Sequence, residues 1–225
     1  MGMISGSQIL ARALRKQGVD TLFFLMGGPM NPAEAACVKE GIRPIDVRHE
    51  QAAAMMAQAW GRVTNRVGVC MAASGPGAVN LITGVGNAWA DAAPLLAIGG
   101  AAPWVSSGTG IFQECDQVAL FKPITKWADR CLDPHRIPEM IATALRQTST
   151  GRPGPVYLDM PGDVLYKEID EDSIVYPEPN TSMSKARPQG ELNAVRAAIK
   201  LLGEVERPVL VSGSGIIWSQ ASAEL

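Results

Sequence analysis

The sequence predicts an α/β fold in which an open, mainly parallel sheet carries helices on both faces, followed by the beginning of a second α/β domain. Short apolar runs alternate along the chain with amphipathic segments of helical length, and this alternation is typical of parallel sheets covered by helices. The 225 residues are 47% hydrophobic and 19% charged, so the chain can bury a real core. After residue 165 the sequence turns polar and proline-bearing before a new helix and apolar run, which predicts the second domain.

The first helix is expected at 7–17, where apolar side chains share one face and Gly18 follows as a stop. A buried strand follows at 19–25. In the next helix Asn31 is expected to be the N-cap, with Pro32 in the first position and Gly41 at the end. The remaining elements are expected to be strands at 42–47, 67–72, 94–100, 124–131 and 154–161, and helices at 50–64, from the 73–80 turn to about Trp89, and at 133–147.

These elements set the expected domain boundaries. The first domain spans 1–165, a linker spans 166–189, and 190–225 forms the truncated start of the second domain. The segment "ELNAVRAAIKLLGE" is patterned as an amphipathic helix, and "RPVLVSGSGI" is patterned as a strand that enters a glycine turn.

Composition excludes several classes of function. The net charge of −2 gives no electrostatic footprint for nucleic acid, and no apolar run approaches the length of a membrane span. The first ten residues lack the basic end and apolar middle of a signal peptide. Four scattered cysteines without a CxxC spacing predict reduced thiols and a cytoplasmic location, and two distant histidines predict no metal site in this chain.

A charged triplet stands out in "VRHEQAAAMMAQAWGR", residues 47–62. Glu50 is expected where a strand ends and a helix begins, which is the edge of a parallel sheet where ligands bind. Two interpretations remain open on spacing alone. Glu50 is either an ordinary acid that is stabilised by the helix dipole or part of a binding site. The Met55–Met56 pair fits core packing.

A second candidate is the turn "SGPGAVN", Ser74–Asn80, between an expected strand and an expected helix. Glycines here expose backbone N–H groups, which can cradle an anion or let a flat ligand approach the backbone. A simple strand-to-helix turn is the alternative. The motif is not GxGxxG, so it does not indicate a nicotinamide site.

Residues 47–100 resemble the N-terminal pyrimidine-binding domain of thiamine-diphosphate enzymes of the acetolactate synthase, 2-hydroxyacyl-CoA lyase and benzaldehyde lyase group. The resemblance continues through "GIFQECDQV", "KPITKWA" and "TGRPGPVYLDMPGDV", so that it covers most of residues 5–165. The run "RPVLVSGSGI" resembles the start of the central domain of that family.

The resemblance implies roles for individual residues. Glu50 would contact the pyrimidine ring of the cofactor and share a proton with it, and the uncharged helix behind Glu50 would provide apolar surroundings. Glu50 and Gln113 are the implied catalytic residues. The implied cofactor-binding residues are Gly27, Gly28, Glu50, Ser74, Gly75, Pro76, Gly77 and Asn80. The implied substrate pocket contains Met30, Phe112, Gln113 and Lys126.

The resemblance also implies an enzyme, namely a lyase or carboligase that makes or breaks the C–C bond next to a carbonyl in 2-oxo acids or 2-hydroxyacyl thioesters. The implied cofactors are thiamine diphosphate and Mg²⁺, whose diphosphate and metal ligands would lie in a C-terminal domain outside this chain. The implied assembly is a homodimer or homotetramer. FAD is possible but is not indicated by these residues. The alternative is a chain without activity of its own that serves as a cofactor half-site or an interaction module.

The residues leave the substrate undecided. Acetolactate synthases usually have Pro-Lys-Asp where this chain has Pro161-Gly162-Asp163, and they usually have "TGQ" where this chain has Ile98-Gly99-Gly100. The "IGG" and "FQECDQV" runs look more like 2-hydroxyacyl-CoA lyases, and "DQVALFKPITKWA" also looks like benzaldehyde lyase. Yet "FQECD" is common in acetolactate synthases as well.

Overall fold

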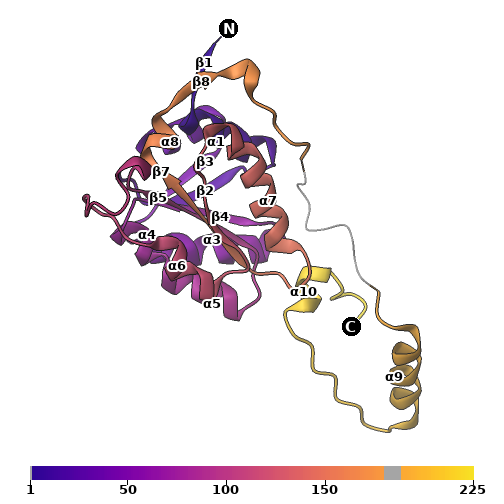
Figure 1. Ribbon diagram of the computed structural model, residues 1–225. Coiled ribbons are helices and arrows are strands. Elements are labelled where there is room, and N and C mark those ends of the chain that lie inside the picture. Colours follow the sequence, from indigo (N-terminus) through magenta and orange to yellow (C-terminus); the bar gives the residue numbers. More distant parts are fainter. Residues whose placement is uncertain (1, 180–188) are drawn as a thin grey trace.

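A computed structural model describes residues 2–179 and 189–225 of the chain. Its centre is a six-stranded sheet of order β3-β2-β4-β5-β7-β6 in which every neighbouring pair is parallel (Figure 1). The strands are β2 Thr21–Phe24, β3 Arg43–Asp46, β4 Gly68–Ala72, β5 Leu95–Ala101, β6 Ala128–Arg130 and β7 Pro155–Pro161. The expected parallel α/β sheet is therefore confirmed.

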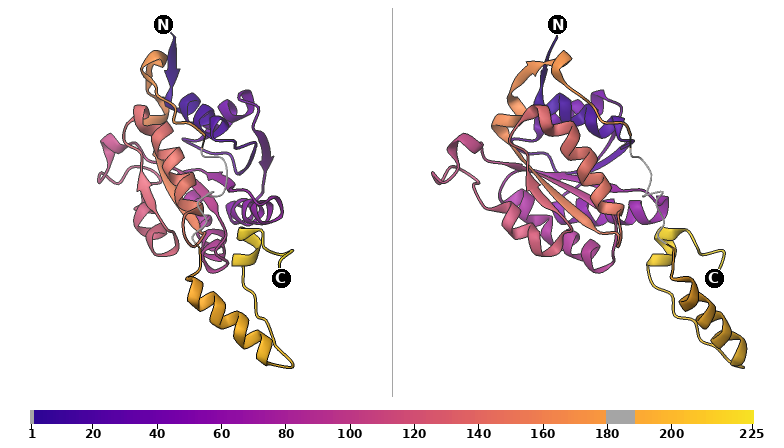
Figure 2. Two further views of the ribbon diagram at one scale, coloured as in Figure 1. Left: turned by 90° about the vertical axis from the view of Figure 1, so that its right-hand side faces the viewer. Right: turned by 45° about the vertical axis from the view of Figure 1, so that its right-hand side comes forward.

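Helices cover both faces of this sheet (Figure 2). One face packs against α1 Gly6–Lys16, α2 Asn31–Lys39, α7 Ile137–Ser149 and α8 Gly162–Tyr166. The other packs against α3 Glu50–Thr64, α4 Pro76–Asn80, α5 Ile82–Ala90 and α6 Gln117–Phe121. The chain thus builds two separate apolar cores, one on each side of a buried sheet.

Alternation along the strands assigns side chains to these two cores. In β4, Val69 and Met71 belong to the α1/α7 core, whereas Cys70 and Ala72 belong to the α3/α5 core. In β7, Tyr157 points to the opposite core from its two neighbours in sequence. Successive strand residues point to opposite faces, so an uninterrupted apolar run is what a doubly covered strand requires.

Two helices begin where local chemistry fixes them. Ser5 and Gln8 form a capping box before α1, with Gln8 N donating to Ser5 Oγ (3.3 Å) and Ser5 N donating to Gln8 Oε1 (2.9 Å). The His49 side chain caps α3 by accepting from Gln51 N. Helix α3 has the expected bounds, and Asn65 ends it in the left-handed region.

Three boundaries differ from the expectation. Met30, not Asn31, occupies the N-cap position of α2, and it makes no side-chain cap bond. Pro32 lies in the first turn, where proline is favoured. The helix expected to reach Trp89 is divided at Leu81 into α4 and α5. The expected strand at 124–131 is reduced to β6, and a 3-10 turn, η2 Lys122–Ile124, precedes it.

Part of the expected linker is regular structure. β8 Glu168–Asp170 pairs antiparallel with β1 Met3–Ser5, and η4 Glu171–Ser173 follows. The polar composition did not predict this strand because its backbone bonds go to the distant N-terminus. Gln17 Nε2 donates to the carbonyl of Pro177 (3.1 Å). Residues 180–188 of the expected linker lie outside the described residues, and the domain boundaries stay a prediction.

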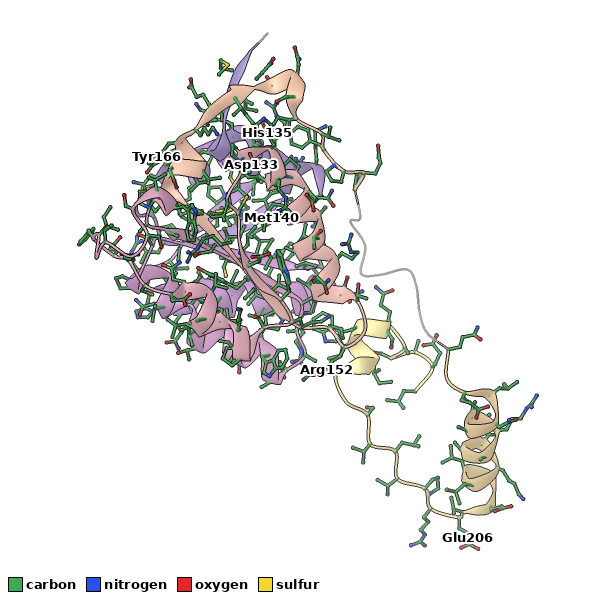
Figure 3. The ribbon with its side chains drawn as sticks, in the orientation of Figure 1. Asp133, His135, Met140, Arg152, Tyr166 and Glu206 are labelled. Atoms are coloured by element: carbon green, nitrogen blue, oxygen red, sulfur yellow. The ribbon has the colours of Figure 1, made fainter. Side chains whose placement is uncertain are left out.

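The last described segment contains the expected amphipathic helix, α9 Leu192–Glu204, whose residues are all exposed. Figure 1 shows α9 apart from the sheet, and Glu206 is labelled at the tip beyond it in Figure 3. The strand expected at 207–216 is wrong: within the described chain no strand pairs with it, and Val209 is 86% exposed. The chain continues into α10 Gly215–Ser219, whose Trp218 packs into the α3/α5 core.

Two further 3-10 turns complete the description, η1 Trp104–Ser106 and η3 Pro134–Arg136. Asp133 caps η3 by accepting from His135 N at 3.0 Å, and α7 follows directly (Figure 3). No helix in residues 2–179 and 189–225 combines the length and the apolar character needed to cross a membrane.

Glu34 is a buried acid on the face of the sheet that carries the α1/α7 core. It lies in the first turn of α2, is 3% exposed, and neither carboxyl oxygen has a hydrogen-bond partner among the described residues. Burial, helped by the negative charge of Asp46, raises the pKa of Glu34 to about 8. The folded protein therefore holds the proton of Glu34 more tightly than the unfolded chain does.

This raised pKa predicts how stability depends on pH. The protonated Glu34 stabilises the folded protein, and this stabilisation is fully present below pH 4.5, the ordinary pKa of a glutamate. It is lost as the pH rises to about 8. The slope is about 1.4 kcal/mol of unfolding free energy per pH unit. In Glu34→Gln this dependence should be absent, whereas Glu139→Gln on the exposed surface of α7 should retain it. Urea unfolding of the three proteins at pH 5 and pH 8 measures the effect, and parallel pH curves for all three would contradict it.

Candidate functional site

The site lies at the carboxyl edge of the sheet, where the chain direction divides. From β2 the chain crosses to β3 on one side, whereas from β4 it crosses to β5 on the other. Loops that leave neighbouring strands in opposite directions open a crevice at this switch point. The loop after β2 contains Gly27 and Gly28, and the loop after β4 contains Ser74 and Gly75. Ser74 joins the two loops, because its N donates to the carbonyl of Gly28 at 3.2 Å.

Glu50 stands beside this crevice as the first residue of α3, and it is 8% exposed. Its Oε2 accepts a hydrogen bond from Nδ2 of Asn80 at 2.9 Å. Its Oε1 has no donor among the described residues. Asn80 is the last residue of α4, so this bond connects the start of one helix with the end of another. One carboxyl oxygen is thus held by the protein, and the other has no partner among the described residues.

Glycines keep the crevice narrow and lined by backbone. A Cβ on Gly27 would lie 2.6 Å from Cβ of Ala73, and a Cβ on Gly77 would lie 3.3 Å from Oε1 of Glu50. Gly75 has φ +59°, and a Cβ there would lie 2.6 Å from the carbonyl oxygen of Gln113. Gly28 has open space where its side chain would be. Any larger residue at three of these positions would displace a neighbour or enter the space beside Glu50.

Gln113 joins the site from a loop distant in sequence. Its Oε1 accepts from Oγ of Ser74 at 2.7 Å, and its φ of +62° places it in the left-handed region. Such a conformation costs free energy in a residue other than glycine, and strained residues of this kind cluster at functional sites. The neighbouring Phe112 is 84% exposed, and Pro76, the first residue of α4, is exposed as well. The structure therefore brings Gln113 to the turn and leaves Phe112 projecting from the chain.

Two of the expected pocket residues do not join this cluster. Met30 is 0% exposed and packs in the α1/α7 core. Its Cγ lies so close to Gly100 that a Cβ on Gly100 would be 2.9 Å from it. Lys126 lies at the amino edge of the sheet, opposite Glu50, because it precedes β6 and its N donates to the carbonyl of Pro155 (2.8 Å). Its Nζ donates to the carbonyl of Thr150, and burial lowers its pKa. Within this chain both residues lie apart from Glu50, and their place in a substrate pocket stays a prediction.

A buried polar group behind the turn was missed from the sequence. Gln117 is 1% exposed, and its Oε1 accepts from Gly75 N at 2.6 Å. Its Nε2 lies 2.9 Å from the carbonyl of Gly100 and 2.8 Å from the hydroxyl of Tyr157, and it also donates to Asp159. The only signal in the sequence was a glutamine opening the apolar run "QVALF".

Asp159 carries the charge in this group. It is 0% exposed on β7 and is paired with Nε of Arg130 at 2.6 Å. Burial raises the pKa of Asp159, whereas its hydrogen bonds from Tyr157 and Arg130 act in the opposite direction. Burial and the nearby Asp159 charge also raise the pKa of Tyr157, which therefore stays a neutral donor. The phenol donates to Oδ1 of Asp159 at 2.7 Å.

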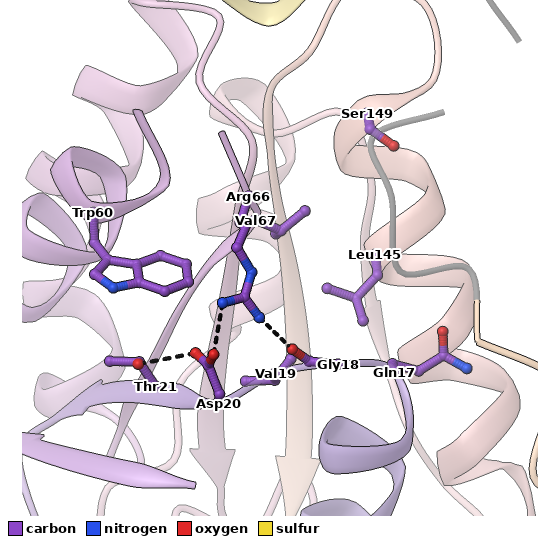
Figure 4. Close-up of a pocket in the computed structure, with 10 residues that line it drawn as sticks. All are labelled: Gln17, Gly18, Val19, Asp20, Thr21, Trp60, Arg66, Val67, Leu145 and Ser149. Atoms are coloured by element: carbon purple, nitrogen blue, oxygen red, sulfur yellow. Dashed lines mark hydrogen bonds and ion pairs between the residues drawn. The ribbon is translucent and has the colours of Figure 1, made fainter. Parts of the chain in front are cut away.

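Hollows also lie away from Glu50. A cavity of about 290 Å³ has Trp104, Cys115 and Arg130 among its lining residues. Another hollow, shown in Figure 4, holds about 30 Å³ at the amino edge of the sheet. There Arg66 pairs with Asp20 (2.6 Å), donates to the carbonyl of Gly18, and lies over the Trp60 ring. The hollow in Figure 4 is thus lined by a structural ion pair at the sheet edge opposite Glu50.

Several known proteins are similar in sequence to this chain. Residues 4–120 match the thiamine pyrophosphate enzyme, N-terminal TPP binding domain. The probable acetolactate synthase large subunit of Methanocaldococcus jannaschii is 40% identical over 225 residues, which cover 99% of this chain and 38% of that protein. The acetolactate synthase large subunit of Corynebacterium glutamicum is 38% identical over 225 residues, covering 99% and 35%. The 2-hydroxyacyl-CoA lyase of Arabidopsis thaliana is 34% identical over 226 residues, covering 99% and 39%. The chain spans less than two fifths of these relatives.

The glycine cradle yields a testable prediction. Gly75→Ala should reduce the free energy of unfolding by about 1–3 kcal/mol, because a side chain is strained at positive φ and would meet Gln113. Gly86→Ala is the matched control, because that glycine lies in α5 with open space around it. It should stabilise the protein by up to about 1 kcal/mol. Denaturant unfolding of both variants checks this, and equal effects would count against a strained turn.

Proposed function

The chain belongs to the thiamine pyrophosphate enzymes through their N-terminal TPP-binding domain, and from this premise we propose that its crevice holds the pyrimidine end of thiamine diphosphate. The observation that supports this most directly is the free Oε1 of Glu50. A side chain that is 8% exposed, with one oxygen fixed by Asn80 and the other without a donor among the described residues, suits a flat heterocycle that offers a ring nitrogen.

The residues around Glu50 fit that ligand in size and chemistry. Gly77 leaves no side chain against Oε1 of Glu50, and the position of a Cβ on Gly28 is open. The glycines at 75 and 77 would let a ring approach the backbone of this largely buried turn without meeting a side chain. Ser74, Gly75, Pro76 and Asn80 belong to this half-site through the turn, and Gln113 belongs to it through its bond with Ser74.

The chain contributes position and proton control. Asn80 holds the carboxyl of Glu50 in one orientation, so that a proton can be shared between Oε1 and the ring nitrogen. The apolar start of α3, with Ala53 and Ala54 fully buried, excludes water from behind the carboxyl. When bound, thiamine diphosphate supplies a nucleophilic carbon and an electron sink for C–C bond chemistry next to a carbonyl. Gln113 and the exposed Phe112 are placed to border the substrate.

The proposed activity is that of a thiamine-diphosphate-dependent lyase or carboligase acting on a 2-oxo acid or a 2-hydroxyacyl thioester. Relatives named as acetolactate synthases and as a 2-hydroxyacyl-CoA lyase match the chain at similar identity, which supports the reaction class without choosing between them. Because the chain spans less than two fifths of these relatives, the activity requires the remaining parts of such an enzyme. A half-site or interaction module without its own activity is the alternative.

Further components of the site are proposed to come from outside these residues. Within residues 2–179 and 189–225, no group of three or more metal-binding side chains stands close enough to hold an ion. Mg²⁺ and the diphosphate would therefore bind to another domain or subunit, in a homodimer or homotetramer. The free thiols of all four cysteines suit a cytoplasmic setting.

The role of Glu50 can be tested in the complete protein that carries this chain. Glu50→Gln should keep the fold and lower turnover with thiamine diphosphate and Mg²⁺ by 10²-fold or more, because the amide cannot share a proton with the ring. Glu139→Gln, the same chemical change on exposed α7, should leave turnover unaltered. Steady-state rates with saturating cofactor measure both. Near-normal turnover of Glu50→Gln would remove the basis of the proposal.

The reaction can be separated from its alternatives by product mass. We expect the complete protein, supplied with thiamine diphosphate and Mg²⁺, to form or cleave a C–C bond in one of three substrates: pyruvate, a 2-hydroxyacyl-CoA thioester, or benzoin. Mass spectrometry of the products identifies which one. A protein that binds the cofactor and converts none of them would favour the half-site interpretation.

A further inference from the structure

We propose that Gln117 is a positioning residue of this site, which sets the place of the 74–80 turn and through it the hydrogen bond between Asn80 and Glu50. The inference rests on the proposed function of Glu50 and assigns a role to a group that does not touch the crevice. The contacts of this one buried amide connect the turn to three strands of the sheet.

The inner contact of Gln117 fixes the amide and the turn together. Gly75 N, a group that can only donate, lies 2.6 Å from Oε1 of Gln117, so the orientation of the amide is settled by chemistry. Gly75 is the N-cap residue of α4 and has no side-chain cap bond of its own. Gln117 therefore satisfies a helix N-terminus that would otherwise leave a buried N–H unpaired.

The outer contacts hold Gln117 to the sheet. Its Nε2 is surrounded by the carbonyl of Gly100 on β5 and by the hydroxyl of Tyr157 and the carboxylate of Asp159 on β7. Asp159 is in turn held by Nε of Arg130 on β6, and the Arg130 guanidinium lies over the Trp104 ring. Three strands of the sheet thus determine where the amide of Gln117 lies.

The sequence leaves space for this arrangement at a specific place. A Cβ on Gly99 would lie 2.1 Å from the hydroxyl of Tyr157, so a side chain there is incompatible with the present position of Tyr157. The Tyr157 ring stacks on Phe121 of α6, with centroids 3.8 Å apart and planes 4° from parallel. Gly99 therefore has a physical function, which is to leave space for the phenol of Tyr157.

The consequence for Glu50 follows from the length of α4. This helix is five residues long, with Gly75 immediately before it and Asn80 as its last residue. A displacement of Gly75 is passed through one short turn to the amide of Asn80. If Asn80 moves, Oε2 of Glu50 loses the donor that orients the carboxyl. Small displacements of a proton-sharing group cost much of the rate, because reaction depends on close alignment.

The test uses the complete protein with thiamine diphosphate and Mg²⁺. Gln117→Met keeps the side-chain length and removes the hydrogen bonds, and Gln117→Leu repeats the loss with another shape. Thr148→Val is the structural control, because Thr148 is also 0% exposed and its Oγ1 donates only to the carbonyl of Leu145, remote from the crevice. Tyr157→Phe removes one outer contact of the amide while leaving the contact with Gly75.

We expect both Gln117 variants to stay folded and to lower kcat at saturating cofactor by tenfold or more, with the substrate KM changed less than threefold. Their Tm should fall below that of Thr148→Val, because Gly75 N and Asp159 each lose a buried partner. Tyr157→Phe should have a smaller effect on kcat. Amide hydrogen exchange, which needs no turnover, should become faster in residues 75–80 of the Gln117 variants and stay unchanged there in Thr148→Val.

A purely structural role predicts a different pattern. The inference is overturned if kcat falls only as far as in Thr148→Val, or if exchange at 75–80 is unaltered in the Gln117 variants. Glu50→Gln, measured alongside, separates the positioning role of Gln117 from the proposed function of Glu50. If Glu50→Gln loses turnover and Gln117→Met retains it, the positioning role alone fails. If Glu50→Gln retains turnover, the proposed function itself fails.

Discussion

The hydrogen bond from Asn80 to Glu50 is the interaction on which the candidate site depends. It connects the first residue of α3 with the last residue of α4, two helices that follow different strands of the sheet. One carboxyl oxygen is held, and the other faces the crevice without a donor among the described residues. Glu50 is consequently held in one orientation by a neighbour thirty residues away in the sequence. This contact supports the proposal that Glu50 belongs to a binding site, and its role there stays a prediction.

That bond is possible because the sheet divides its connections between β2 and β4. The loops after these strands leave in opposite directions, and glycines at 27, 28, 75 and 77 let their backbones approach without side chains between them. A second, buried set of contacts through Gln117, Asp159 and Arg130 fixes the turn from behind. The position of the 74–80 turn therefore depends on polar contacts with β6 and β7, two strands that do not contribute residues to the turn.

Local patterns in the sequence predicted a large part of this structure. The bounds of α3 follow from an alanine-rich helical period and a cap at His49, and the buried strands follow from apolar runs at 68–72 and 95–101. Glu50, Gly75 and Gln113 were selected by resemblance, and they lie together at one sheet edge. These features depend on neighbours in the chain, or on motifs whose spacing is fixed by them.

The remainder depends on contacts between distant residues. β8 pairs with the N-terminal β1, so its polar sequence looked like a linker, and residues 207–216 have no neighbouring strand to pair with in the described chain. Lys126 precedes β6, which places it at the opposite edge from Glu50, and the full burial of Met30 comes from packing across α1. Gln117 was missed because one polar residue in an apolar run gives no sign of what it bonds.

The most direct measurement is a structure of the complete protein bound to thiamine diphosphate and Mg²⁺. The account predicts that Oε1 of Glu50 lies about 2.6–3.0 Å from a pyrimidine ring nitrogen, with Asn80 still donating to Oε2. A bound cofactor whose ring lies elsewhere, with Oε1 of Glu50 hydrogen-bonded only to protein groups or water, would contradict it.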